Sequence, residues 1–145
     1  MPWPVFVHTA GGGRWTVDTL LQLDALLTAL ATVGPPGWVE ITSSRGRRGL
    51  GVAVGRGDVS SLTYADRDQP GWLTSVGASP GALGGYEFTA LDGSAQLVGA
   101  EQAVPVQRAW QATTEFVQTG QRPTCVQWRS IPSHGSGSVP AYNGL

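Results

Sequence analysis

The sequence has 145 residues, a formal net charge of −1 and only 13% charged residues, unlike the basic footprint of a nucleic-acid-binding domain. Cys125 is its single cysteine, which excludes an internal disulfide, and no run of about 18 apolar residues could cross a membrane. Residues 1–10 lack the basic and apolar segments of a signal peptide. We therefore expect a cytoplasmic protein with a single domain at 1–131.

A leucine-rich segment predicts the first helix. Its leucines recur at helical spacing, and Thr19 with Gln22 three residues later matches a capping box. The Gly34-Pro35-Pro36-Gly37 run ends the pattern, because proline cannot continue a helix. We expect this helix at about residues 19–33. Around it, alternating apolar residues predict strands at 3–9, 38–43, 50–54, 59–65 and 72–76.

The second half predicts weaker strands, a second helix and a closing strand. Pro105 stands where the first turn of a helix tolerates proline, apolar residues on one helical face follow it, and Gly120 supplies the stop. Further strands are expected at residues 86–91, 95–98 and 125–131, with a glycine-rich loop at 77–85 and a disordered Ser/Gly/Pro-rich tail at 132–145.

These elements together predict an α+β fold. Short turns between the strands favour a mostly antiparallel sheet, and two amphipathic helices would cover one of its faces. The other face would stay open to solvent or to a partner.

The sequence offers little that could carry catalysis. One cysteine and two histidines are too few for the three or four ligands of a zinc site, so we expect neither a metal nor a cofactor. A nucleophilic pair would have to join Cys125 to His8 or His134. The glycine run at 11–13 lacks the lysine and the spacing of a phosphate-binding loop.

Charged and aromatic residues point instead to a binding surface. Five acidic residues, Asp58, Asp66, Asp68, Glu87 and Asp92, fall in the strand-rich middle and could meet a basic partner if they gather on the open sheet face. The basic cluster Arg45, Arg47 and Arg48 is typical of a solvated hairpin tip. Because Trp and Tyr anchor many interfaces, our candidate contact residues are Tyr64, Asp66, Asp68, Trp72, Tyr86, Glu87 and Asp92.

An ordered set of short patterns over roughly residues 3–131 resembles a known family. The patterns are Thr16-Val17-Asp18-Thr19 before Leu23-Asp24-Ala25-Leu26-Leu27, then Leu62-Thr63-Tyr64, Ser75-Val76-Gly77, Ala103-Val104-Pro105-Val106, Ala109, Phe116, Gly120, Arg122-Pro123, Val126 and Trp128. In this respect the chain is similar to the Imm-one immunity proteins of bacterial polymorphic toxin systems. The resemblance implies a protein that binds its cognate toxin, expected to be of the deaminase type, and blocks the active site. Compared with the family, the chain is short of acidic residues, which argues against an acidic plug in a basic cleft.

We therefore expect a toxin inhibitor with no catalysis of its own and no direct contact with nucleic acid or membrane. One alternative is an accessory or structural module that binds a partner without inhibiting it. The other is a small hydrolase or transferase, which would need convergent polar groups in a pocket.

Overall fold

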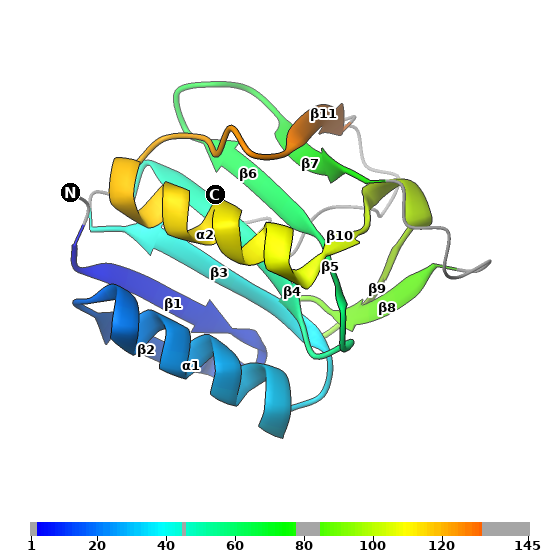
Figure 1. Cartoon of the computed structure of the whole chain (residues 1–145), viewed down its shortest axis with the longest axis horizontal. Helices are drawn as coiled ribbons and strands as arrows, with labels where there is room; N and C mark the ends of the chain where they lie inside the picture. The colour runs from blue at the N-terminus through cyan, green and yellow to red at the C-terminus, as the bar shows by residue number, and fades with distance from the viewer. Residues whose placement is uncertain (1–2, 45, 78–84, 132–145) are drawn as a thin grey trace.

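Two helices lie on one face of a large, mostly antiparallel sheet (Figure 1). This confirms the predicted α+β class and the predicted placement of both helices on one face of the sheet. The computed structural model describes residues 3–44, 46–77 and 85–131. The predicted tail at 132–145 and most of the predicted glycine-rich loop at 77–85 lie outside these residues.

Eleven strands and two helices are found among the described residues. The strands are β1 (Val5–Thr9), β2 (Arg14–Val17), β3 (Gly37–Ser43), β4 (Arg48–Val54), β5 (Val59–Ser60), β6 (Leu62–Asp66), β7 (Trp72–Val76), β8 (Tyr86–Thr89), β9 (Ala95–Val98), β10 (Val104–Pro105) and β11 (Gln127–Ile131). The helices are α1 (Leu20–Val33) and α2 (Val106–Thr119), and short 3₁₀ turns cover Ala10–Gly12 and Ala100–Gln102.

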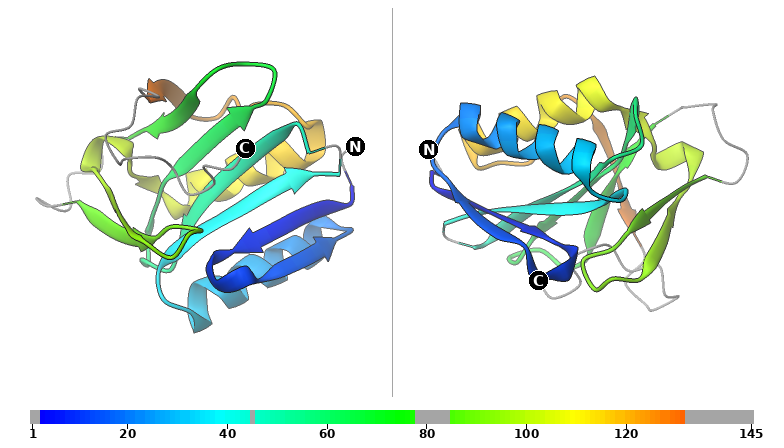
Figure 2. Two further views of the ribbon diagram at one scale, coloured as in Figure 1. Left: turned by 180° about the vertical axis from the view of Figure 1, so that it is seen from behind. Right: turned by 90° about the horizontal axis from the view of Figure 1, so that it is seen from below.

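The main sheet runs in the order β11-β7-β6-β4-β3-β1-β2, with antiparallel neighbours throughout. The β8–β9 hairpin joins it through a parallel bridge between Gly37 and Thr89. This hairpin lies on the side of the sheet away from the helices (Figure 2). A separate two-stranded ladder joins β5 to β10, immediately before α2.

The start of α1 follows the predicted capping box with one change of partner. The Thr19 hydroxyl accepts a hydrogen bond from the Gln22 amide at 3.1 Å, as expected. The Gln22 side chain reaches back to the amide of Asp18, at 2.9 Å, rather than to that of Thr19. Leu23 and Leu27 are buried, whereas Leu21 is 79% exposed and Val33 is 85% exposed. This helix is therefore apolar on its outer face as well as its inner one.

The second helix is strongly amphipathic. Its inner face buries Ala109, Ala112, Thr113, Phe116 and Val117 against the sheet. At its end, Gly120 adopts a left-handed φ of 70°, and its amide donates to the Phe116 carbonyl at 2.7 Å. The predicted stop at Gly120 is confirmed, because glycine takes this conformation without steric cost.

Two apolar clusters hold the layers together. The larger one lies between the helices and the sheet, and Trp110 and Trp128 pack at its margin. The smaller cluster, on the other sheet face, joins Trp38 and Ala53 to Phe88 and Val98 of the hairpin. None of the helices within 3–44, 46–77 and 85–131 is long and apolar enough to cross a membrane.

The structure differs from the predicted elements in several places. Arg14–Val17 forms β2, a strand that was not predicted. The strand expected at 59–65 is divided into β5 and β6 at Ser61, whose carbonyl accepts from the Ala53 amide at 3.0 Å. The last strand begins at Gln127, two residues later than expected.

Candidate functional site

The second helix lies between two hollows on the helix side of the molecule. The first, which we call the polar cleft, has a volume of about 1070 Å³ and separates the end of α2 from β6, β7 and β11. The second, the apolar groove, has a volume of about 290 Å³ and lies between α1 and α2 above β4. Both hollows lie on the sheet face that carries the helices.

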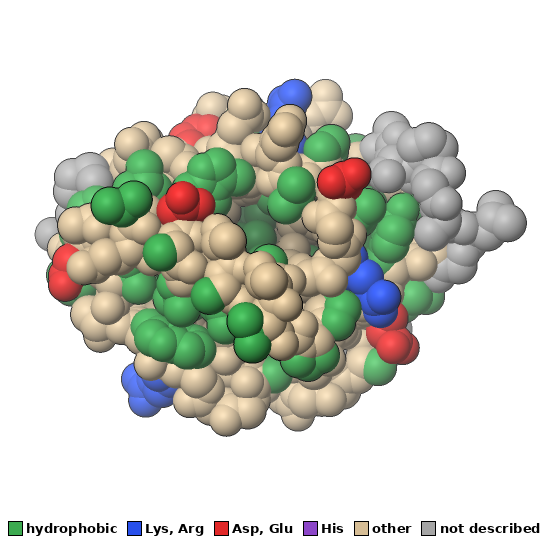
Figure 3. Space-filling view, turned by 60° about the horizontal axis from the view of Figure 1, so that its bottom comes forward, with side chains coloured by type: hydrophobic (Ala, Val, Ile, Leu, Met, Phe, Trp, Pro, Cys, Tyr) green, Lys and Arg blue, Asp and Glu red, His purple; other side chains and the backbone are tan. Residues whose placement is uncertain are grey.

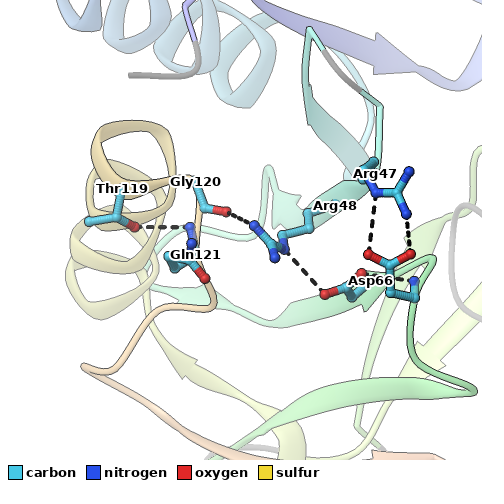
Figure 4. A network of polar contacts seen from close by, with 7 residues as sticks. Arg47, Arg48, Asp66, Thr119, Gly120 and Gln121 are labelled. Atoms are coloured by element: carbon cyan, nitrogen blue, oxygen red, sulfur yellow. Dashed lines mark hydrogen bonds and ion pairs between the residues drawn. The ribbon is translucent and has the colours of Figure 1, made fainter.

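Arg48 forms the frame of the polar cleft (Figure 4). Its Nε donates to a carboxylate oxygen of Asp66 at 3.2 Å, and its Nη1 donates to the Gly120 carbonyl at 3.1 Å. The side chains of Arg48 and Asp66 are only 34% and 16% exposed. One guanidinium therefore connects β4, β6 and the end of α2, and it holds the walls of the cleft together.

A second ion pair, between Arg47 and Asp68, lies just outside this frame. The Arg47 guanidinium binds both carboxylate oxygens of Asp68 (Figure 4). The Asp68 amide donates to Asp66 at 2.9 Å. This amide, together with the Arg48 guanidinium, holds the pKa of the Asp66 carboxyl below its usual range. Asp66 is therefore a fixed anion at neutral pH, with its charge already matched.

Aromatic rings form the floor of the cleft. The Tyr64 ring lies edge-on to Phe116, at a centroid distance of 6.2 Å, and tilted against Trp128, at 6.0 Å. The Trp128 indole donates to the Pro123 carbonyl at 2.8 Å, which fixes the chain between α2 and β11. Burial raises the pKa of the Tyr64 phenol, with Arg48 acting in the opposite direction. The phenol is therefore protonated at neutral pH.

The apolar groove has a different chemistry. Its walls are small and aliphatic residues of both helices and of the turn after β4, and Asp24 is the one charged residue among those lining it. Val106, at its rim, is 42% exposed. Figure 3 shows this side of the molecule, where hydrophobic side chains are numerous and charged ones few. Exposed apolar surface of this kind is typical of interaction sites.

The contact residues predicted from the sequence do not form one surface. Tyr64 is buried, with only 6% of its surface exposed. Trp72 lies on the opposite face of the sheet, because Tyr64 pairs with Leu73 in the ladder of β6 and β7. Asp66 and Asp68 lie beside the polar cleft, whereas the other three lie on or beside the β8–β9 hairpin: Tyr86, Glu87 and Asp92.

The acidic residues likewise do not gather on one sheet face. Two of them, Asp66 and Asp68, are matched by arginines at the ends of β4 and β6. Asp92 accepts hydrogen bonds from the amide and hydroxyl of Ser94, at 2.9 and 2.6 Å. Asp58 lies in the turn before β5, where its carbonyl accepts from the Val106 amide. The condition for meeting a basic partner there, a shared position on the open sheet face, is therefore not met.

The arginines of the cleft are not among the predicted contact residues. Arg47 and Arg48 were predicted to form a solvated hairpin tip, but Arg48 is half-buried and makes the contacts that shape the site. The sequence position of Arg48 could have indicated its burial, because Arg48 stands directly before the apolar residues of β4. Arg122 also lines the cleft and had been noted only as part of a pattern. Arg45 lies outside the described residues.

The structure does not assemble the nucleophilic pair that was considered. His8 lies on β1, whereas Cys125 lies just before β11, and four strands separate β1 from β11 in the sheet. Burial and the nearby Glu115 raise the pKa of the Cys125 thiol, which disfavours a thiolate. His134 lies outside the described residues. In the described part of the chain, no three His, Cys, Asp or Glu side chains are grouped to hold a metal ion.

Comparison with known families identifies the family of this chain. The family model for Immunity protein Imm1 matches residues 11–130, a span that includes both helices and every residue of the cleft frame. The chain belongs to the Imm1 immunity protein family. The match confirms the resemblance seen in the sequence. As a member of this family, the chain is an immunity protein directed against a bacterial toxin. A search of curated proteins finds no match.

Proposed function

We propose that this Imm1 protein neutralises its cognate toxin by binding it and covering its active site, without a reaction of its own. The observation that carries the proposal is the family match over residues 11–130. From the sequence resemblance, we further propose that the toxin is of the deaminase type and that inhibition takes place in the cytoplasm. In such a pair the zinc ion and its ligands belong to the toxin.

We place the contact surface on the helix side, around α2. A stable interface needs about 800 Å² on each partner, with an apolar centre and a polar rim. The apolar groove would supply the apolar centre and the polar cleft would supply part of the polar rim. The helix α2 lies between them. Asp66 and Asp68 remain proposed contacts at this site. The surface of Trp72, Tyr86, Glu87 and Asp92 is the alternative contact region.

The test uses the purified protein and the product of the toxin gene beside its own gene. Toxin activity is measured at increasing ratios of the immunity protein, and we expect it to be abolished near one equivalent. Full toxin activity at a stoichiometric excess would refute the proposal. Binding that leaves the toxin active would identify an accessory module instead, and substrate turnover by the immunity protein alone would identify an enzyme.

The cytoplasmic part of the proposal has its own test. Cells that produce the toxin without an export signal are given the Imm1 chain, also without an added signal. Survival is expected only when the chain is present. Cell death despite normal amounts of the folded protein would contradict inhibition in the cytoplasm.

A further inference from the structure

The polar cleft has one more positive charge than negative charge. Its charged lining residues are Arg48, Asp66 and Arg122. Arg48 and Asp66 neutralise each other through their ion pair. Arg122 is exposed, and within the described residues no hydrogen bond or ion pair of its side chain is found. The cleft therefore presents one guanidinium whose charge is not matched.

The backbone beside Arg122 is held in place by its neighbours. The next residue, Pro123, is buried and accepts the hydrogen bond from the Trp128 indole. The backbone that carries the guanidinium is thus held against the aromatic floor. A fixed attachment point reduces the conformational entropy that an arginine loses when it binds. It also keeps Arg122 at the mouth of the cleft.

The floor offers a hydrogen-bond donor in the same cleft. Within the described residues, the Tyr64 hydroxyl makes no hydrogen bond, although its ring is packed between Phe116 and Trp128. Asp66 is engaged by Arg48 and by the Asp68 amide, and among the described residues it accepts no hydrogen bond from this donor. A guanidinium and a phenol hydroxyl are both donors that suit a carboxylate.

We propose that the polar cleft binds an acidic side chain of the toxin, with its carboxylate paired to Arg122 and hydrogen-bonded to the Tyr64 hydroxyl. The inference rests on the proposed function, since the partner is the toxin, and it adds the chemistry of the contact. The charges are the reverse of those considered from the sequence, where acidic residues of this chain would meet a basic partner. Here the positive charge lies on the immunity protein. Arg and Tyr are among the residues that most often dominate interface energetics.

The experiment measures binding to a catalytically inactive form of the toxin by titration calorimetry, in 50 and 300 mM NaCl. Three variants are compared with the wild type: Arg122→Gln, Tyr64→Phe and, as a matched control, Arg14→Gln. Arg14 is also an exposed arginine, but it lies on β2 at the far edge of the sheet. Thermal unfolding of each variant shows that the fold is kept.

We expect Arg122→Gln to weaken binding about 30-fold at low salt, the effect of a hot-spot side chain. The remaining affinity should depend less on NaCl, because a screened charge pair has been removed. Tyr64→Phe should weaken binding about fivefold, the loss of one modest hydrogen bond. Arg14→Gln should bind within about twofold of the wild type, as expected for a charge outside the contact.

Two results would separate the inference from the proposed function. If the wild-type protein binds and inhibits the toxin but Arg122→Gln binds equally well with unchanged salt dependence, the cleft assignment is wrong and the proposed function stands. If the wild type does not bind the toxin, both fail. A further positive result would be recovery of Arg122→Glu binding by a toxin in which one acidic residue is changed to arginine.

Discussion

The Arg48 guanidinium donates to the carbonyl of Gly120, a residue 72 positions further along the chain, at 3.1 Å. Gly120 is the left-handed residue that caps the end of α2, so the carbonyl of the capping residue is satisfied by a side chain from β4. The same guanidinium pairs with Asp66. A single arginine therefore determines where the helix ends relative to the sheet, and with it the width of the polar cleft.

Replacing Arg48 with alanine should destabilise the fold. The change leaves Asp66 and the Gly120 carbonyl without their donor in a half-buried site, and we expect a loss of about 2 kcal/mol in the free energy of unfolding. Urea denaturation measures it. Arg47→Ala is the control, because Arg47 and Asp68 are 61% and 50% exposed, and an exposed pair of this kind contributes little to stability. Equal losses in the two variants would contradict the structural role of Arg48.

Gly77 should not tolerate alanine. A Cβ atom at this position would lie 1.5 Å from the carbonyl oxygen of Ala103, which belongs to the backbone and cannot move aside as a flexible side chain could. The Gly77 amide also donates to the Glu101 carbonyl at 2.8 Å, which holds the two segments close. We expect Gly77→Ala to cost about 3 kcal/mol or more, or to prevent folding.

Gly34→Ala provides the comparison for that variant. The nearest atom to a Cβ at this position is the Leu30 carbonyl oxygen, at an ordinary contact distance of 3.7 Å. The backbone there has a φ of −97°, which alanine adopts readily. Its stability should change by less than about 1 kcal/mol. Both variants are measured by thermal unfolding, and a stable Gly77→Ala protein would show that the two segments can separate.

Local signals in the sequence were sufficient for the helices. The cap at Thr19 and the stop at Gly120 depend on residues within one turn, so the pattern alone locates both. By contrast, β2 gives a weak signal because only Val17 of its four residues is buried. Its strand character comes from pairing with β1, a partner that the local pattern does not reveal.

The candidate site was harder to predict, because its parts come from distant segments. The polar cleft needs Arg48 from β4, Tyr64 from β6 and Arg122 from the segment after α2, and no spacing rule connects these positions. Because side chains alternate along a strand, Leu62 and Tyr64 lie on the same face of β6, and both are buried. The same reasoning argues against Tyr64 as an exposed contact, but it could not show that its hydroxyl lies at the floor of a cleft.

Glu40 should make stability depend on pH. It is 9% exposed, and within the described residues one of its carboxylate oxygens has no hydrogen-bond partner. Burial raises the pKa of this carboxyl from 4.5 to about 7, with Arg67 opposing the shift. The folded state therefore binds the proton more tightly than the unfolded state, and stability falls as pH rises from about 4.5 to 7.

The variant Glu40→Gln should remove this dependence, because glutamine carries no charge at any pH. We expect it to be more stable than the wild type by about 2 kcal/mol at pH 8 and equal to it near pH 4. Thermal unfolding from pH 4 to 8 measures the difference. Glu87→Gln, an exposed glutamate on β8, should show no comparable gain at pH 8. An equal gain in the stability of Glu40→Gln at pH 4 and at pH 8 would exclude ionisation of Glu40 as the cause.

Introducing a charge at the rim of the apolar groove should weaken toxin binding without harming the fold. Val106 lines the groove, and it is also the first residue of α2, where a glutamate interacts favourably with the helix dipole. We therefore expect Val106→Glu to unfold within about 0.5 kcal/mol of the wild type. Its affinity for the inactive toxin should fall about tenfold, because the buried carboxylate must lose its water. Gln107→Glu adds the same charge one residue later, at an exposed position that does not line the groove, and it should bind normally. Equal affinity of the two variants would exclude the groove from the interface.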